Sequence, residues 1–243
     1  MNFFDDSILT FVNHFSHKSV VFDQVVVFLE NTNLLKGAGF LAFFWGCWLQ
    51  PVPDLTRRRK IILSTLVGCA VAILAARLLA LNLPFRGRPL NDDSIHFLHP
   101  FGTSQHTLET WSSFPSDHAA LFFGLATGCF MLNRRVGILA ATYAFVCVML
   151  PRVYLGFHYP TDILAGGMIG VAAVSLAHAG WVREKVAGLG MVWMEKHPLS
   201  FYACLFLATY QFVVLFEDIR AGGHFAAHLY HYLRAGTPFP EAG

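Results

Sequence analysis

The sequence is poor in charge. Only 13% of its 243 residues are Asp, Glu, Lys or Arg, against about 25% in an ordinary soluble domain. The net charge of +2 gives no basic excess for nucleic-acid binding. The apolar composition excludes a disordered chain. Hydrophobic residues make up 55% of the chain, and so few charges cannot cover a soluble globule of this size. We therefore predict an all-α integral membrane protein.

The sequence also shows no sign of a disulfide framework or of a secretory signal peptide. The five cysteines lie inside apolar runs, where cysteine behaves as a small buried hydrophobe, so we predict neither a disulfide framework nor a zinc site. The N-terminus carries Asp5 and Asp6 where a secretory signal carries positive charge, and no small-residue cleavage site follows. We expect no cleaved leader.

Six stretches approach the roughly 20 apolar residues that cross a membrane. Residues 1–32 show a helical apolar stripe that Asp23 and Glu30 interrupt, which predicts an interfacial helix. The six predicted transmembrane helices are 34–50, 61–83, 117–132, 136–156, 162–181 and 198–216. The predicted organisation is an interfacial segment (1–32), a membrane domain (33–217, motif core 61–180) and a tail (218–243) with His224, His228 and His231.

Lysine and arginine cluster in three connections between these helices. Because such clusters mark the cytoplasmic side, the 84–116 and 157–161 loops are predicted to face outward. The clustered residues are those at 57–60, Arg134, Arg135, Arg183, Lys185 and Lys196.

Three polar segments converge on this outward side. They read FRGRP at 85–89, FPSDH at 114–118 and PRVYLGFHYPTD at 151–162. A charge within or beside a membrane helix is costly and marks a function or a buried partner. The segments supply guanidiniums, imidazoles, a hydroxyl and a carboxylate, but no carboxylate cluster for Mg²⁺, so we predict no metal and no cofactor.

This inventory suits a phosphate group. Arginine binds phosphate bidentately, and Ser116 is placed to cap a helix whose N-terminus favours an anion. His158 and Asp162 are four residues apart, so Asp162 can accept a hydrogen bond from one ring nitrogen and leave the other free to attack phosphorus. His118 comes from another helix and can protonate the leaving oxygen and then activate water.

The three segments resemble the signature motifs of the type-2 phosphatidic acid phosphatase superfamily: Lys-x6-Arg-Pro, Pro-Ser-Gly-His and Ser-Arg-x5-His-x3-Asp. The resemblance covers about 61–180 and implies a six-helix, metal-independent membrane phosphatase. It assigns His158 as the phosphorylated nucleophile, Asp162 as its orienting carboxylate and His118 as the acid for the leaving group. The residues that it assigns to phosphate binding are Arg88, Arg152 and Ser116.

The first motif departs from the family pattern. Leu81 stands where the motif has lysine. Arg86 is one candidate for the missing positive charge at the phosphate site. Arg77, one helical turn before position 81, is the other.

The other two motifs also depart from the pattern. Asp117 replaces a glycine, and either it orients His118 or Arg88, or it caps its helix. The Asp117 variant and the absent lysine are both similar to the pattern of the bacitracin-resistance type of undecaprenyl pyrophosphate phosphatase. This similarity implies a polyprenyl pyrophosphate substrate. Pro151 replaces a serine, and the sequence offers no reason for it.

The motifs do not identify the substrate, because they bind the phosphate group that all candidate lipids share and other surfaces contact the lipid tail. The alternatives are phosphatidylglycerol phosphate, phosphatidic acid and lipid A. A non-enzymatic binder of anionic lipids or a transporter is a different class, against which the intact His118, His158 and Asp162 argue. The resemblance implies a bacterial plasma-membrane enzyme with an extracytoplasmic site, which acts on a lipid phosphate or pyrophosphate within the bilayer.

Overall fold

The computed structural model describes residues 2–103 and 110–214, and none of these residues lies in a strand. The all-α prediction is confirmed. The predicted C-terminal tail, with His224, His228 and His231, lies outside the described residues. The elements are α1 (Phe3–Asn13), α2 (Val20–Asn31), α3 (Asn33–Leu49), α4 (Leu55–Asn82), the 3₁₀ turns η1 (Pro89–Asn91) and η2 (Asp93–Ile95), α5 (Asp117–Leu132), α6 (Arg134–Tyr143), the π-helix η3 (Ala144–Met149), α7 (Leu150–Tyr154), α8 (Pro160–Ala177), α9 (Gly180–Lys196) and α10 (Pro198–Val213).

Each predicted membrane span coincides with a helix or a continuous run of helices. Three of them are long and apolar enough to cross a membrane: α4, the run from α6 through α7, and α8. The apolar helices α5 and α10 are shorter. Six crossings and an outward-facing site stay predictions.

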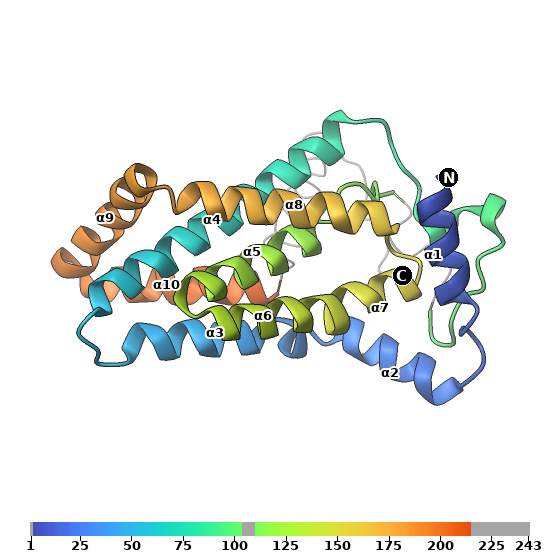
Figure 1. Cartoon of the computed structure of the whole chain (residues 1–243), viewed down its shortest axis with the longest axis horizontal. Helices are drawn as coiled ribbons and strands as arrows, with labels where there is room; N and C mark the ends of the chain where they lie inside the picture. Colours follow the sequence, from blue (N-terminus) through green and yellow to red (C-terminus); the bar gives the residue numbers. More distant parts are fainter. Residues whose placement is uncertain (1, 104–109, 215–243) are drawn as a thin grey trace, which may run out of the picture.

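Helices α4, α5 and α8 pack against one another at the centre of the molecule (Figure 1). Their contact buries small and apolar side chains, among them Cys69 and Val174, which lie against Gly124 of α5. The three motif segments lie together at one end of these helices, near α1, and α9 lies at the opposite end (Figure 1). The fold therefore gathers residues from distant parts of the chain at one end of the bundle.

Two glycines let α8 approach α5 closely. Gly166 and Gly170 are one turn apart, and a Cβ atom at either would collide with a backbone carbonyl oxygen, that of Ser116 or that of Ala120. Small residues at this spacing are typical of tightly packed membrane helices. The close approach sets the start of α5, which carries His118, directly against the first turns of α8.

The N-terminal segment differs from its prediction. It forms two helices, where one interfacial helix was expected. Helix α1 contacts α7 and α8, and α2 contacts α7. The acidic residues Asp5, Asp23 and Glu30 are buried, because each has a partner in or beside a motif segment. The interfacial position of the segment stays a prediction.

The predicted fourth span is not a uniform helix. The amide of Leu150 donates to the carbonyl of Phe145 five residues earlier, which makes η3 a π-helix. Pro151 has no N–H to donate, so the regular series of helical backbone hydrogen bonds is interrupted there as well. A π-helical turn of this kind changes the direction in which the residues after it point. Arg152 lies in α7, which begins directly after η3.

The predicted loop between the fifth and sixth spans is wrong. These residues form α9, which packs against the start of α4. Lys60 Nζ donates to Glu184 at 2.5 Å and joins the two helices. The basic residues at this end therefore lie on helices, not on an extended loop.

We expect Gly166→Ala to destabilise the protein, because the new methyl group must push α5 and α8 apart. Overpacking of this kind costs about 1–3 kcal/mol and should lower the thermal midpoint in detergent by roughly 2–10 °C. The matched control is Gly188→Ala in α9, where a Cβ meets nothing within 4 Å. That variant should be about 0.5–1 kcal/mol more stable, and an equal loss in both variants would contradict the close-packing argument.

Candidate active site

Backbone hydrogen bonds join the three motif segments into one site. They link the first segment to the second, the first to the third and the second to the third. Since none involves a side chain, the site is assembled by the fold itself. The three bonds run from Ser113 N to Arg86 O (2.9 Å), from Leu90 N to Gly156 O (2.9 Å) and from Ser116 N to Asp162 O (3.1 Å).

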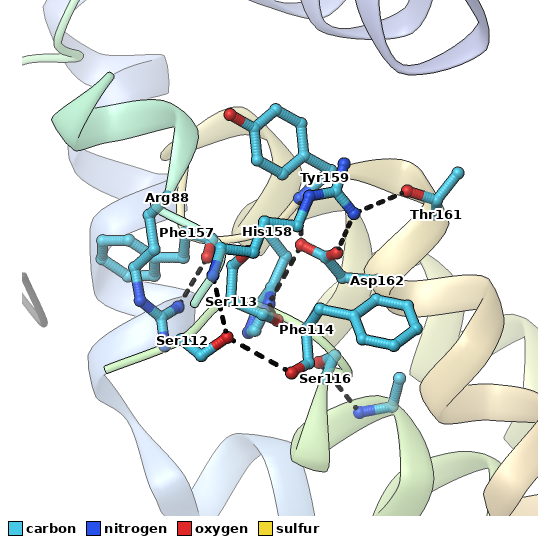
Figure 2. A network of polar contacts seen from close by, with 12 residues as sticks. Arg88, Ser112, Ser113, Phe114, Ser116, Phe157, His158, Tyr159, Thr161 and Asp162 are labelled. Carbon is cyan, nitrogen blue, oxygen red and sulfur yellow. Dashed lines mark hydrogen bonds and ion pairs between the residues drawn. The ribbon is translucent and has the colours of Figure 1, made fainter. Parts of the chain in front are cut away.

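His158 lies at the centre of the site with 2% of its surface exposed (Figure 2). Its Nδ1 donates to the carbonyl oxygen of Ser113 at 2.8 Å. A carbonyl only accepts, so Nδ1 carries the proton and Nε2 keeps its lone pair. Within the described part of the chain, Nε2 is buried without a hydrogen-bond partner.

Two groups face Nδ1 of His158, the carbonyl of Ser113 and the carboxylate of Asp162. Asp162 lies 3.8 Å from Nδ1, which is too long for a hydrogen bond. The backbone carbonyl of Ser113 takes that place. Spacing within the third motif could not reveal Ser113, because Ser113 lies 45 residues earlier in the chain, directly before the second motif segment. Asp162 is still close enough to stabilise positive charge on the ring.

The surroundings favour a neutral His158. Burial, together with the charges of Arg152 and Arg88, lowers the pKa of His158 to about 4, although Asp162 acts in the opposite sense. The imidazole is therefore unprotonated at neutral pH. An uncharged ring with a free lone pair is the form that a nucleophile requires.

Asp162 and Arg86 form an ion pair at the start of α8. Asp162 accepts from the backbone of Tyr159 at 2.8 Å, which caps the helix, and from Arg86 at 2.5 Å. Arg86 also donates to the buried Asp5 at 2.8 Å. Because two buried carboxylates hold Arg86, these contacts favour a positioning role over the direct phosphate binding expected from the sequence.

The second motif holds His118 through its neighbour. Asp117 accepts from the backbone amide of His118 at 3.0 Å and lies 3.3 Å from the ring Nδ1. The other oxygen of Asp117 pairs with Arg77. Of the alternatives left open by the sequence, Asp117 thus contacts His118, and Arg77 reaches the second motif. Ser116 caps α5 as predicted, accepting from the Ala119 amide at 3.4 Å.

Arg88 and Arg152 are the most buried arginines of the motifs, with 6% and 3% of their surface exposed. Arg88 donates to the carbonyl of Phe157 at 2.5 Å, and Arg152 pairs with Glu30. In both, Nε has no hydrogen-bond partner among the residues described. Burial and the nearby Arg152 lower the pKa of Arg88 to about 10, so Arg88 remains charged at neutral pH.

Three acidic residues at the site were not expected from the sequence. Asp5 accepts from Arg86 and from the amide of Thr161, and Glu30 pairs with Arg152. Asp23 accepts from Tyr154, which lies within the third motif segment. Their position inside apolar helices was the available signal, since a charge there needs a partner.

An apolar cavity of about 610 Å³ opens beside the second motif. Leu81, Leu83, Phe85 and Trp111 line it together with two polar neighbours of the site, Arg77 and Asp117. The position of the missing lysine therefore belongs to an apolar wall. No group of three or more His, Cys, Asp or Glu arranged to hold a metal occurs within the two described stretches.

Comparison with known proteins identifies the fold family. Residues 85–186, which contain all three motif segments, match the family model described as PAP2 superfamily. The chain contains a PAP2 superfamily domain. The resemblance to the type-2 phosphatidic acid phosphatases is confirmed.

The PAP2 domain has curated relatives at modest identity. The bacitracin transport permease protein BcrC of Bacillus licheniformis is 25% identical over 185 residues, 73% of this chain and 79% of the relative. The putative undecaprenyl-diphosphatase YbjG of Escherichia coli is 27% identical over 50% of this chain and 59% of that protein. The lipid A 4'-phosphatase of Bacteroides thetaiotaomicron is 46% identical over 24% of this chain and 26% of that protein.

No solved structure matches the chain. With the apolar helices, the similarities identify a membrane protein related to lipid phosphatases.

The buried imidazole of this PAP2 domain makes stability depend on pH. The pKa of His158 falls from 6.5 in the unfolded chain to about 4 in the fold. Between these values the unfolded state binds more protons, so stability is lost as the pH falls from 6.5 to 4, by roughly 3 kcal/mol.

We expect His158→Gln to remove this component. The thermal midpoint should then fall less between pH 7 and pH 4 than it does in the wild type. His197→Gln, at an exposed position, serves as the control. Parallel curves for wild type and His158→Gln would contradict the lowered pKa.

Proposed function

We propose that this protein is a metal-independent lipid phosphatase that works through a phosphohistidine on His158. The observation that best supports it is the buried imidazole whose Nδ1–H is held by Ser113 and whose Nε2 is unpartnered among the residues described. Its neutral state and the nearby Arg88 and Arg152 charges agree with attack on an anionic phosphate.

The first step transfers the phosphoryl group to the enzyme. Nε2 of His158 attacks the terminal phosphorus, and the bond from phosphorus to the bridging oxygen breaks. The electron pair leaves with the lipid product, which His118 protonates. The ring now carries positive charge, which Asp162 at 3.8 Å stabilises.

The second step releases phosphate. His118, now neutral, takes a proton from water, and the resulting hydroxide attacks the phosphohistidine. The N–P bond breaks, inorganic phosphate leaves, and His158 regains its lone pair. Asp117 keeps the His118 ring in place throughout.

The phosphate oxygens are bound by Arg88 and Arg152, with the N-terminus of α5 at Ser116 as a further site. Arg77 pairs with Asp117 and so helps to hold the residue that contacts His118. Arg86 contributes mainly by fixing Asp162. We infer that these guanidiniums supply the charge stabilisation that a metal supplies in other phosphatases.

Undecaprenyl pyrophosphate is the substrate that we propose. The relative named putative undecaprenyl-diphosphatase and the bacitracin-resistance-type pattern at Leu81 and Asp117 support it. The apolar cavity beside Asp117 suits the first units of a long lipid chain. The lipid monophosphate is a good leaving group, so the demand on His118 as an acid is small.

Two alternatives rest on the other relatives. Similarity to a lipid A 4'-phosphatase favours a lipid monophosphate, for which phosphatidic acid and phosphatidylglycerol phosphate are also candidates. A relative named as a transport permease favours a binder or transporter without catalysis. The unpartnered Nε2 of His158 argues for catalysis.

The first test is phosphate release in EDTA from undecaprenyl pyrophosphate, phosphatidic acid and lipid A. We expect the pyrophosphate to be hydrolysed fastest, and His158→Ala to lose at least about 1,000-fold in turnover, because the nucleophile is gone. His197→Ala, at an exposed position far from the motifs, should keep wild-type turnover.

Each result of this assay has a distinct meaning. Faster turnover of a lipid monophosphate would overturn the substrate but keep the mechanism. Activity that needs a metal, or that survives His158→Ala, would overturn the mechanism.

The proposed location is a bacterial plasma membrane, with the site on the extracytoplasmic side. In a variant without native cysteines, Ser94→Cys should react with an impermeant thiol reagent in intact cells, and Arg57→Cys should not. Both positions are exposed and lie at opposite ends of the predicted topology. Reaction of Arg57→Cys alone would turn the site to the cytoplasm.

A further inference from the structure

Two charged residues outside the predicted phosphate site, Glu30 and Lys36, form a buried network with one of its arginines, Arg152. Arg152 of α7 pairs with Glu30 near the end of α2, and Lys36 of α3 lies 3.8 Å from the same carboxylate. Lys36 also donates to the Glu30 backbone carbonyl at 2.5 Å. Only 8% of Glu30, 4% of Lys36 and 3% of Arg152 is exposed.

Local structure gives no reason for these charges. Glu30 lies in the last turn of its helix and Lys36 near the first turn of the next, so each faces the unfavourable end of a helix dipole. Burial adds a desolvation penalty to both. Their benefit must therefore come from the tertiary contact with Arg152.

The charge balance of the network suggests what that benefit is. A lone Glu30 would neutralise Arg152 and compete with phosphate for the same guanidinium. Lys36 compensates Glu30, so the three residues together keep one positive charge. That charge acts on His158, whose pKa Arg152 helps to lower.

We propose that Lys36 is a positioning residue of the phosphate site, which through Glu30 holds Arg152 in place and keeps it positively charged toward the substrate. The proposal rests on the proposed phosphatase function. It also links a lysine to the site through Glu30, although Leu81 occupies the motif position and is 80% exposed.

The test is a double-mutant cycle with Glu30→Gln, Lys36→Met and the double variant. The readouts are kcat and KM for the lipid pyrophosphate, the inhibition constant of inorganic phosphate, and the thermal midpoint. Lys60→Met and Glu184→Gln, an exposed pair at 2.5 Å at the far end of the molecule, form the matched control cycle.

We expect the two single variants to move phosphate affinity in opposite directions. Lys36→Met should weaken phosphate binding about tenfold or more, because Glu30 then neutralises Arg152. Glu30→Gln should strengthen phosphate binding, because the carboxylate that competes for Arg152 is gone, but it should lower kcat, because Arg152 loses its anchor. The double variant, with its net charge restored, should bind phosphate within about threefold of the wild type. The control cycle should show no such effects.

If Lys36 had only a structural role, Lys36→Met would lower the thermal midpoint, and the two single variants would not shift phosphate affinity in opposite directions. Wild-type phosphate affinity in a folded Lys36→Met variant would overturn the proposal. If Lys36→Met does not fold, the double variant decides, and a loss beyond threefold in it, or failure to fold, also overturns the proposal. A wild-type protein that releases no phosphate would instead refute the phosphatase function.

Discussion

A cation buried beside a membrane needs an anion or a backbone carbonyl in contact with it, and the organisation of this protein follows from that constraint. Arginines from α4 and from the first and third motif segments enter a largely buried site, and carboxylates from α1, α2, α5 and α8 contact them. Asp5 and Asp162 hold Arg86, Asp117 pairs with Arg77, and Glu30 pairs with Arg152. The first two helices are therefore structural parts of the site.

The same carboxylates limit how much positive charge remains for a substrate. Arg86 is balanced by two of them, whereas Arg88 donates to a backbone carbonyl and stays charged despite its burial. Arg152 shares its carboxylate with Lys36. The positive field is thus concentrated on Arg88 and Arg152, the two arginines whose charges act on the buried His158. This separates arginines that hold the site together from those available to phosphate.

Sequence alone was sufficient for the features that depend on local pattern. It predicted the apolar helices, the Ser116 cap and the convergence of three motifs, because hydropathy, capping and chain order determine them. It missed Glu30 and Lys36, although a charge inside an apolar helix was the criterion already applied to Arg152. It also assigned to Asp162 the hydrogen bond that Ser113 accepts, because a backbone carbonyl carries no residue signature. Long-range partners of this kind appear only once the helices are packed.

The close contact of α5 and α8 restricts how a lipid can approach the histidines. At Gly166 and Gly170 the backbones come so near that not even a methyl group fits between them. A hydrocarbon chain therefore cannot slide into the site through this seam. The apolar cavity beside the end of α4, by contrast, has Arg77 and Asp117 in its wall and about 610 Å³ of space. For the lipid substrate that we propose, entry through this cavity would bring the head group first to Asp117, which contacts His118.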